Sequence, residues 1–217
     1  MPGQRDLSNT AVFFDFDGTI TTTDTGVHLL ERTNAAGWKD LDAEYAAGRI
    51  GSRDCIELQW RMIPDEFSEA DRRAIAAEVR IDEGFGPLVD GLQANGAYVA
   101  VVSDGWGFYI DDILRQWDLP VFTNTIDFAT QSLVSPHARP SCEVCGVCGT
   151  CKPQFLEAAT ADGKRTVFVG DGTSDRHAAR VADEVFAKGA LARWCQEQGL
   201  AHTAFDLLND VATALLP

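Results

Sequence analysis

Residues 11–19 read AVFFDFDGT, a run in which four consecutive apolar residues lead directly into two closely spaced aspartates. Continuous apolar runs suit strands that are covered on both faces of a parallel sheet. Similar runs occur at 98–102, 121–122, 166–169 and 185–186. Helical patterns separate them, at 87–93, 108–117 and 190–198. Strands that alternate with helices predict an α/β fold with a Rossmann-like parallel sheet.

Residues 24 to about 82 interrupt this alternation, because they show three or four helical patterns and no convincing strand. Ile56, Trp60 and Ile63, for example, recur at helical spacing. The chain returns to the sheet near 84–87, where the sequence GFGP is typical of a boundary. We therefore predict an α/β core from residues 1–22 and 84–217, an inserted all-helical domain from residues 23–83, and a cysteine-rich loop at 140–152 within the core.

The composition describes an acidic chain with enough apolar residues for a substantial core. Its 217 residues carry 18 basic and 33 acidic side chains, a formal net charge of −15, and are 45% hydrophobic. This charge argues against nucleic acid or an anionic membrane as the main partner. A small anionic metabolite stays possible, since a local cation or metal can invert the field at one site. Residues 1–10 carry no apolar signal segment, so we expect a cytoplasmic protein; the oligomeric state is left open.

Acidic and polar residues follow three of the predicted strands directly, and a lysine begins a later helix. Ligands of open parallel sheets bind beyond the carboxyl ends of the strands, so these side chains are expected to meet at one edge. The set comprises Asp15, Asp17, Ser103, Asp104, Lys152, Asp171 and Asp175. Carboxylates that gather near one point repel each other and need a hard cation, and Mg²⁺ fits oxygen ligands of this kind. We therefore expect Mg²⁺ to be the cofactor.

The same residue types are those that phosphoryl transfer requires. A metal-bound carboxylate can attack phosphorus and form an aspartyl phosphate. A second carboxylate two residues further on can protonate the leaving oxygen and then take a proton from water. Lys152, Ser103 and backbone N–H groups can hold the transferring oxygens. Taken singly, Asp17-Gly18 is typical of a turn and Ser103 of a helix cap. It is the order of the whole set that favours phosphatase chemistry.

This combination resembles the phosphatase branch of the haloacid dehalogenase-like superfamily over the whole predicted core. Four segments carry the resemblance: FFDFDGTI at 13–20, VSDG at 102–105, Lys152, and GDGTSD at 170–175. The helical insertion between the first two segments resembles the C1 cap of that superfamily, as in phosphoserine phosphatases. The resemblance therefore implies a core with an inserted helical cap and a phosphomonoester hydrolase.

The resemblance also implies a role for each residue of the set. Asp15 would be the nucleophile and Asp17 the general acid and base. The implied ligands of Mg²⁺ are Asp15, the backbone carbonyl of Asp17, and Asp171. The implied phosphate-binding residues are Ser103, Asp104 and Lys152, and Asp175 would orient Lys152 and the metal-bound water. Asp104 departs from the family pattern, in which glycine is more usual, and its extra carboxylate can alter the affinity for phosphate.

Three finer features resemble the methionine-salvage phosphatase group, which acts on 2-hydroxy-3-keto-5-methylthiopentenyl-1-phosphate. They are CGTCKP at 148–153, Asp24 after a threonine run, and LARWCQE at 191–197. Related members take phosphocholine-type or other small phosphomonoesters, so the substrate stays open. The alternatives are a phosphotransferase or phosphomutase of the same superfamily, a receiver-like signalling module, and a protein built around bound metal at its cysteines. Receiver modules, however, carry no insertion of this length.

Four cysteines follow one another as C-x2-C-x2-C-x2-C, at Cys142, Cys145, Cys148 and Cys151. Such spacing can supply a structural Zn²⁺ site, and it also resembles the ligation of an iron–sulfur cluster. Disulfides or free thiols are the third reading. A bound metal would fix the loop that presents Lys152. Cys55 and Cys195 lie within helical patterns and are expected to be small buried hydrophobic residues.

Substrate specificity is expected to reside in the helical insertion, since that part of the site is not committed to phosphoryl chemistry. Its candidate contacts are Asp24, His28, Arg49 and Arg53. An isolated arginine on a helix is usually solvated, and a histidine is often satisfied by a neighbour within its own domain. Each of the four therefore has a structural alternative.

Overall fold

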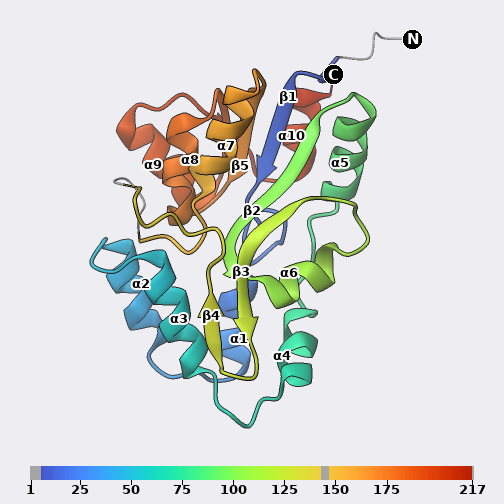
Figure 1. Ribbon diagram of the computed structural model, residues 1–217. Helices are drawn as coiled ribbons and strands as arrows, with labels where there is room; N and C mark the ends of the chain where they lie inside the picture. The colour runs from blue at the N-terminus through green and yellow to red at the C-terminus, as the bar shows by residue number, and fades with distance from the viewer. Residues whose placement is uncertain (1–5, 143–146, 217) are drawn as a thin grey trace.

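The computed structural model describes residues 6–142 and 147–216, and a twisted sheet of seven strands runs through its centre (Figure 1). The strands are β1 (Thr10–Phe14), β2 (Tyr98–Trp106), β3 (Val121–Asp127), β4 (Ser132–Val134), β5 (Arg165–Gly170), β6 (Glu184–Ala187) and β7 (Thr203–Ala204). Their order is β4-β3-β2-β1-β5-β6-β7, and only the β3–β4 pair is antiparallel. The predicted fold class is confirmed. The short strands β4 and β7 were not expected.

Strand β1 shows why these apolar runs form the centre of the sheet. All five of its residues are buried, and successive side chains point to opposite faces. Val12 and Phe14 belong to the apolar cluster on one face, while Ala11 and Phe13 belong to the cluster on the other. The helices that cover the faces are α5 (Phe85–Ala94), α6 (Gly107–Leu114) and α10 (Leu208–Leu215), and, opposite them, α7 (Lys152–Ala161), α8 (Arg176–Val181) and α9 (Gly189–Gln198) (Figure 1).

Four helices lie in the segment between β1 and α5, as the helical patterns predict. They are α1 (Thr25–Arg32), α2 (Trp38–Ala46), α3 (Ser52–Met62) and α4 (Glu69–Ala76), and we call them the helical insertion. Figure 1 shows them below the carboxyl ends of β1 and β2. Arg73 of α4 donates hydrogen bonds to the backbone oxygen of Phe108 at 2.8 Å and to Asp112 of α6 at 2.6 Å. These contacts tie the α4 end of the insertion to the core.

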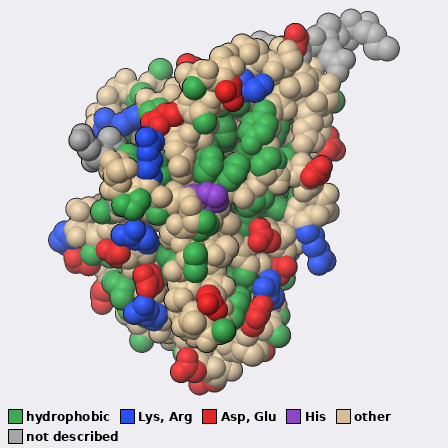
Figure 2. Space-filling model, viewed as in Figure 1, with side chains coloured by type: hydrophobic (Ala, Val, Ile, Leu, Met, Phe, Trp, Pro, Cys, Tyr) green, Lys and Arg blue, Asp and Glu red, His purple; other side chains and the backbone are tan. Residues whose placement is uncertain are grey.

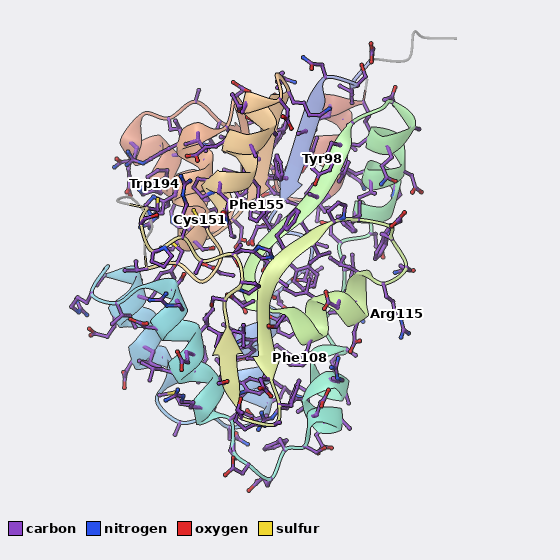
Figure 3. The ribbon with its side chains drawn as sticks, viewed as in Figure 1. Tyr98, Phe108, Arg115, Cys151, Phe155 and Trp194 are labelled. Atoms are coloured by element: carbon purple, nitrogen blue, oxygen red, sulfur yellow. The ribbon has the colours of Figure 1, made fainter. Side chains whose placement is uncertain are left out.

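Aromatic contacts fix the start of α7, where Lys152 lies. Hydrophobic side chains gather on the molecular surface beside β2 and β3 (Figure 2). In this region the ring of Phe155 from α7 stacks on Phe122 of β3, with 4.2 Å between the ring centroids (Figure 3). The backbone oxygen of His137 accepts hydrogen bonds from the N–H of Cys151 at 3.0 Å and from the side chain of Gln154 at 2.9 Å. The first turn of α7 is therefore held from two sides.

Two further observations concern the chain as a whole. Cys55 and Cys195 are buried, with 2% and 0% of their surface exposed, as expected of small hydrophobic residues. Among the helices of the described residues, none has the length and apolar character that crossing a bilayer requires.

Candidate active site

The carboxyl ends of β1, β2 and β5 open onto a cavity of about 320 Å³ that the helical insertion closes on the other side. The lining residues from the predicted set are Asp15, Asp17, Ser103, Asp104 and Asp171. The lining residues from the insertion include Asp24, Val27, Asp42, Tyr45, Ser52, Cys55, Ile56 and Gln59. The structure thus brings side chains from distant parts of the sequence to one place, as the strand-end rule predicts.

Lys152 contacts Asp15, which lines the core end of this cavity. The lysine is only 1% exposed, and its Nζ donates hydrogen bonds to Asp15 Oδ1 at 2.6 Å, Asp175 Oδ1 at 2.6 Å and Ser174 Oγ at 3.1 Å. Burial by itself lowers the pKa of Lys152, but the charges of Asp15 and Asp175 outweigh it and raise that pKa. The lysine therefore keeps its positive charge between two buried carboxyl groups.

The second oxygen of Asp175 is also committed. It accepts hydrogen bonds from the backbone N–H groups of Asp171 and Gly172, each at 2.9 Å. Asp175 consequently joins the loop after β5 to Lys152, which is the geometry that an orienting role requires.

Burial and the neighbouring charge of Asp175 raise the pKa of Asp15 well above its ordinary value, although Lys152 opposes that rise.

Three carboxylates lie close enough to share a cation. One oxygen each of Asp15, Asp171 and Asp175 lies within 4.8 Å of the others. The predicted metal set contained Asp17 in place of Asp175. Because both oxygens of Asp175 already accept hydrogen bonds, Asp15 and Asp171 are the carboxylates left to hold an ion. Their hard oxygen atoms fit Mg²⁺.

Asp171 is held in place by neighbours that the motif itself supplies. Thr19 Oγ1 donates a hydrogen bond to Asp171 Oδ1 at 2.9 Å. Gly18 has φ +74°, and a Cβ atom there would lie 2.6 Å from Asp171 Oδ2, so this position demands glycine on both counts. Burial, and then the charge of Asp175, raises the pKa of Asp171 to about 6. A cation at this position would relieve the repulsion between the two carboxylates.

Asp17 lies apart from the three-carboxylate group. Its Oδ2 accepts a hydrogen bond from the hydroxyl of Tyr109 at 2.7 Å, and its Oδ1 accepts one from the backbone N–H of Thr25 at 2.9 Å. Burial raises the pKa of Asp17, and these two hydrogen bonds partly offset the rise. The sequence analysis missed Tyr109 and Thr25, because nothing in the local sequence around either residue relates it to Asp17.

Ser103 and Asp104 lie within a register shift of β2. The pairing of β2 with β3 changes register between Val102 and Trp106, which re-aims the side chains in between. Ser103 is buried and its Oγ accepts a hydrogen bond from the N–H of Gly105 at 2.9 Å. The carboxylate of Asp104, which lines the cavity, accepts hydrogen bonds from Ser52 Oγ at 2.6 Å and from the backbone N–H of Thr150; its place at the phosphate stays a prediction.

The insertion end of the cavity is acidic and lacks a basic side chain among the described residues that line it. Asp24 caps α1 by accepting a hydrogen bond from Val27 N–H at 2.8 Å, and burial raises its pKa to about 8. Asp42 accepts a hydrogen bond from the side chain of Gln59 at 2.7 Å. Trp106 and Tyr109 supply aromatic surface from the core. Of these residues, the sequence analysis singled out Asp24 alone.

The other candidate specificity residues lie outside this lining. His28 lies 3.0 Å from Glu78, and Arg49 forms an ion pair with Glu44 at 2.6 Å. Arg53 lies 3.9 Å from its neighbour Asp54. For these three the structural alternative accounts for the contacts that the structure shows.

The cysteine-rich loop is described only in part. Cys151 is buried at the position before α7, between that helix and the helices α2 and α3 (Figure 3). Cys142 and Cys148 are partly exposed. Cys145 lies outside the described residues. Zinc binding by all four thus stays a prediction.

The chain that carries these residues matches a known class of hydrolases. The profile of the haloacid dehalogenase-like hydrolase family matches residues 12–180, so the chain belongs to this family. The family predicted from the four motifs is confirmed, and so is the prediction of a hydrolytic enzyme.

Particular relatives agree over almost the whole chain. Two are named 2-hydroxy-3-keto-5-methylthiopentenyl-1-phosphate phosphatase. The one from Exiguobacterium sp. is 29% identical over 210 residues, which cover 94% of this chain and 96% of the relative. The one from Geobacillus kaustophilus is 31% identical over 208 residues, 94% of each chain. A solved structure titled as a phospho-aspartyl intermediate analogue of phosphoserine phosphatase shares the fold, with a TM-score of 0.77, 18% identity, and coverage of 97% of this chain and 99% of that one.

Proposed function

We propose that the chain is a Mg²⁺-dependent phosphatase that hydrolyses a small phosphomonoester through an aspartyl phosphate on Asp15. The observation that carries this proposal is the position of Asp15. Its carboxylate lies at the floor of the cavity, 2.6 Å from Lys152 Nζ and within 4.8 Å of an oxygen of Asp171. A nucleophile, a fixed cation and a pair of metal-binding carboxylates are thereby present within reach of one phosphoryl group.

In the first step, an oxygen of Asp15 attacks phosphorus and the bond from phosphorus to the ester oxygen breaks. Asp17 gives its proton to that leaving oxygen, and the alcohol departs. Burial favours the protonated form of Asp17, and its hydrogen bonds to Tyr109 and Thr25 hold the carboxyl group in one orientation. Lys152 and Ser103 hold the phosphoryl oxygens that do not react.

In the second step, water attacks phosphorus of the aspartyl phosphate and gives its proton to Asp17. The bond from phosphorus to Asp15 breaks, inorganic phosphate leaves, and the enzyme returns to its starting state. Asp15 and Asp171 would hold Mg²⁺, with the backbone carbonyl of Asp17 as a further ligand. When bound, Mg²⁺ supplies positive charge that offsets the repulsion between Asp15 and the phosphate.

We further propose that residues 23–83 act as a cap domain that selects the leaving group of the substrate. Contacts from α1, α2 and α3 line the cavity opposite the strand ends, whereas the phosphoryl chemistry rests on core residues. The cap would thereby recognise the part of the substrate that differs between phosphomonoesters.

The chemistry of the cavity favours a leaving group without negative charge. A carboxylate there would face Asp42 and, above about pH 8, the charged form of Asp24. Among the described lining residues there is no lysine, arginine or histidine to pair with it. The name of the two bacterial relatives supplies a specific candidate, 2-hydroxy-3-keto-5-methylthiopentenyl-1-phosphate, whose leaving group is uncharged. Phosphoserine fits less well, because it carries a carboxylate.

A panel of phosphomonoesters tests the proposal. It contains para-nitrophenyl phosphate, the methionine-salvage compound, phosphoserine, and a matched pair of one size: 2-hydroxyethyl phosphate and phosphoglycolate. We expect hydrolysis with Mg²⁺, none with a chelator, none by Asp15→Asn, and a preference for 2-hydroxyethyl phosphate over phosphoglycolate. Hydrolysis that survives in Asp15→Asn would exclude Asp15 as the nucleophile. Transfer of phosphate to an added alcohol rather than to water would identify a phosphotransferase instead.

The four clustered cysteines carry a separate proposal, a structural Zn²⁺ that steadies the loop before Lys152. Cys142, Cys145, Cys148 and Cys151 supply the soft ligands that Zn²⁺ prefers. Elemental analysis of the purified protein after removal of Mg²⁺ should find about one zinc per chain. Iron with acid-labile sulfide would indicate an iron–sulfur cluster. If the protein contains neither zinc nor iron, the cysteines form disulfides or are thiols.

A further inference from the structure

The carboxylate of Asp104 lies where three separate parts of the chain meet, and the reaction steps above do not use it. It is only 8% exposed, and each of its two oxygens accepts a hydrogen bond from a different segment. Its backbone oxygen accepts a further hydrogen bond from Asn124 of β3 at 2.7 Å. A buried carboxylate with this many partners is costly to disturb, because hydrogen bonds to a charged acceptor are stronger than neutral ones.

On the insertion side, Asp104 holds the first residue of α3. Ser52 is 4% exposed, and its Oγ donates to Asp104 while it accepts from the N–H of Gly149 at 3.3 Å. The N–H of the next residue, Arg53, donates to the backbone oxygen of Val147 at 3.2 Å. The amino-terminal end of α3 is therefore bonded both to the strand end and to the loop that precedes α7.

On the lysine side, Asp104 holds the loop itself. The N–H of Thr150 donates to Asp104, and the backbone oxygen of Thr150 accepts from the N–H of Lys152 at 3.0 Å. Thr150 is buried and stands two residues before the lysine that contacts Asp15. The position of Lys152 and the position of α3 thus depend on the same carboxylate.

We propose that Asp104 is a positioning residue that joins the helical insertion to the loop carrying Lys152, and so sets the cavity depth and the lysine position together. This role rests on the proposed phosphatase function of the same cavity. The α4 end of the insertion is tied to the core differently, through Arg73 and Asp112, whose side chains are 35% and 49% exposed. The contact at the α3 end is the buried one, next to the reacting groups.

Four variants separate this role from a general effect on folding. Asp104→Ala removes both hydrogen bonds of the carboxylate. Ser52→Ala removes the bond to Asp104 and the longer bond from the N–H of Gly149, but keeps the bond from Thr150 to Asp104. Asp104→Asn is the conservative variant, because its amide oxygen can accept from Thr150 and its amide N–H can donate to Ser52. Ser68→Ala is the matched control: Ser68 also begins an insertion helix, but its Oγ hydrogen bonds are with Asp71 of the same helix.

Steady-state kinetics with 2-hydroxyethyl phosphate, and inhibition by inorganic phosphate, give the first measurement. We expect Ser52→Ala to raise KM about tenfold and to leave the inhibition constant of phosphate unchanged, since inorganic phosphate is proposed to contact the core alone. Asp104→Ala should raise both constants about tenfold, because Thr150 and Lys152 also lose their alignment. Asp104→Asn should have wild-type values of KM and of the phosphate inhibition constant, and so should Ser68→Ala.

Amide hydrogen exchange of residues 147–152 gives a second measurement that does not depend on activity. Exchange at residues 147–149 should be faster in Ser52→Ala and in Asp104→Ala than in the wild type, whereas exchange at residues 150–152 should be faster in Asp104→Ala alone. Both should be unchanged in Asp104→Asn and Ser68→Ala. The effects of the two changes should not multiply in the double variant Ser52→Ala/Asp104→Ala, since the hydrogen bond between the two side chains is already lost in each single variant.

Wild-type exchange and kinetics in Asp104→Ala, or effects that multiply in the double variant, would overturn the proposal. If Asp104→Ala fails to fold, Ser52→Ala and Asp104→Asn decide the question by the same two measurements. A wild-type protein that hydrolyses no phosphomonoester would overturn the proposed function, whereas the exchange data would still test whether Asp104 holds the two segments together.

Discussion

The two ends of the cavity differ in whether their buried carboxyl groups have a cationic partner. At the core end, Lys152 lies between Asp15 and Asp175, so its positive charge has two buried partners. At the insertion end, Asp24 and Asp42 have hydrogen-bond donors but no cation among the described lining residues. Under the proposed function, the core end would hold the phosphate and the metal, and the insertion end would disfavour a second negative group. The reaction and the choice of substrate would then depend on different parts of the chain.

The strongest way to break this contrast is Lys152→Met. The change leaves Asp15 and Asp175 buried beside each other without a cation, and removing one partner of a buried ion pair costs about 3–5 kcal/mol. For a chain of this size the melting temperature should fall by roughly 10 °C. Thermal unfolding in Mg²⁺-free buffer measures it.

Arg49→Met is the control for Lys152→Met. It breaks the exposed ion pair with Glu44, which should contribute about 1 kcal/mol or less. Equal melting temperatures for the two variants would show that Lys152 is not a structural partner of the buried carboxylates.

Asp17→Asn should lower the turnover of para-nitrophenyl phosphate by at least about 100-fold, because an amide can neither protonate the leaving oxygen nor accept a proton from water. The phosphorylated enzyme should accumulate, as intact-protein mass spectrometry can show. Tyr109→Phe removes the hydrogen bond to Asp17 and the longer one that the hydroxyl accepts from the N–H of Trp106, and it should cost less than about tenfold. An unchanged rate in Asp17→Asn would remove Asp17 from the mechanism.

The raised pKa of Asp24 predicts that the choice between substrates depends on pH. With a pKa of about 8, its carboxyl group is neutral below that pH and charged above it. The preference for 2-hydroxyethyl phosphate over phosphoglycolate should therefore rise about tenfold between about pH 7 and pH 9, since a nearby unit charge repels the carboxylate. The ratio of the two kcat/KM values measures it.

Two variants sharpen the prediction for Asp24. Asp24→Asn should flatten the rise, because an amide does not ionise. Asp40→Asn removes one acidic group from the exposed surface of α2 and should behave like the wild type. A rise that persists in Asp24→Asn would assign the discrimination to another group.

The smallest expected effect concerns Asp171→Asn. Removing one of three neighbouring carboxylates relieves repulsion, so the metal-free variant should unfold about 2–4 °C above the wild type, equivalent to about 1 kcal/mol. Mg²⁺ should raise the melting temperature of the wild type and not that of the variant. A variant less stable than the metal-free wild type would show that the charge of Asp171 gains more from Lys188 and Lys152 than it loses by repulsion from the neighbouring carboxylates.

The sheet and the core end of the cavity could be predicted because the signals are local. The run 11–14 is apolar enough to be covered on both faces, and Asp15 follows it without a break. Parallel strands end at one edge, so the motifs after β1, β2 and β5 had to meet. Strands β4 and β7 could not be predicted in this way, because three and two residues carry no recognisable pattern.

Asp104 shows contacts that the sequence could not supply. The family resemblance implied a place at the phosphate, which stays a prediction. The structure adds that its carboxylate, within a register shift of β2, accepts hydrogen bonds from Ser52 of α3 and from Thr150 in the loop before α7. The same holds for Tyr109, whose partner Asp17 lies in the turn after β1, and for Asp42, whose partner Gln59 lies on α3. No periodicity or spacing in the sequence signals such contacts.

By itself the sequence determined the α/β class, the helical insertion and the order of Asp15, Asp17, Ser103, Lys152 and Asp171, because strand, turn and motif signals extend over only a few neighbouring residues. The tertiary structure alone decided which charges are paired. Lys152 meets a carboxylate 137 positions away, and Asp104 meets a serine 52 positions away. Hydrogen bonds and ion pairs act over a few ångströms, so partners this distant in sequence are chosen only when the folded chain brings them together.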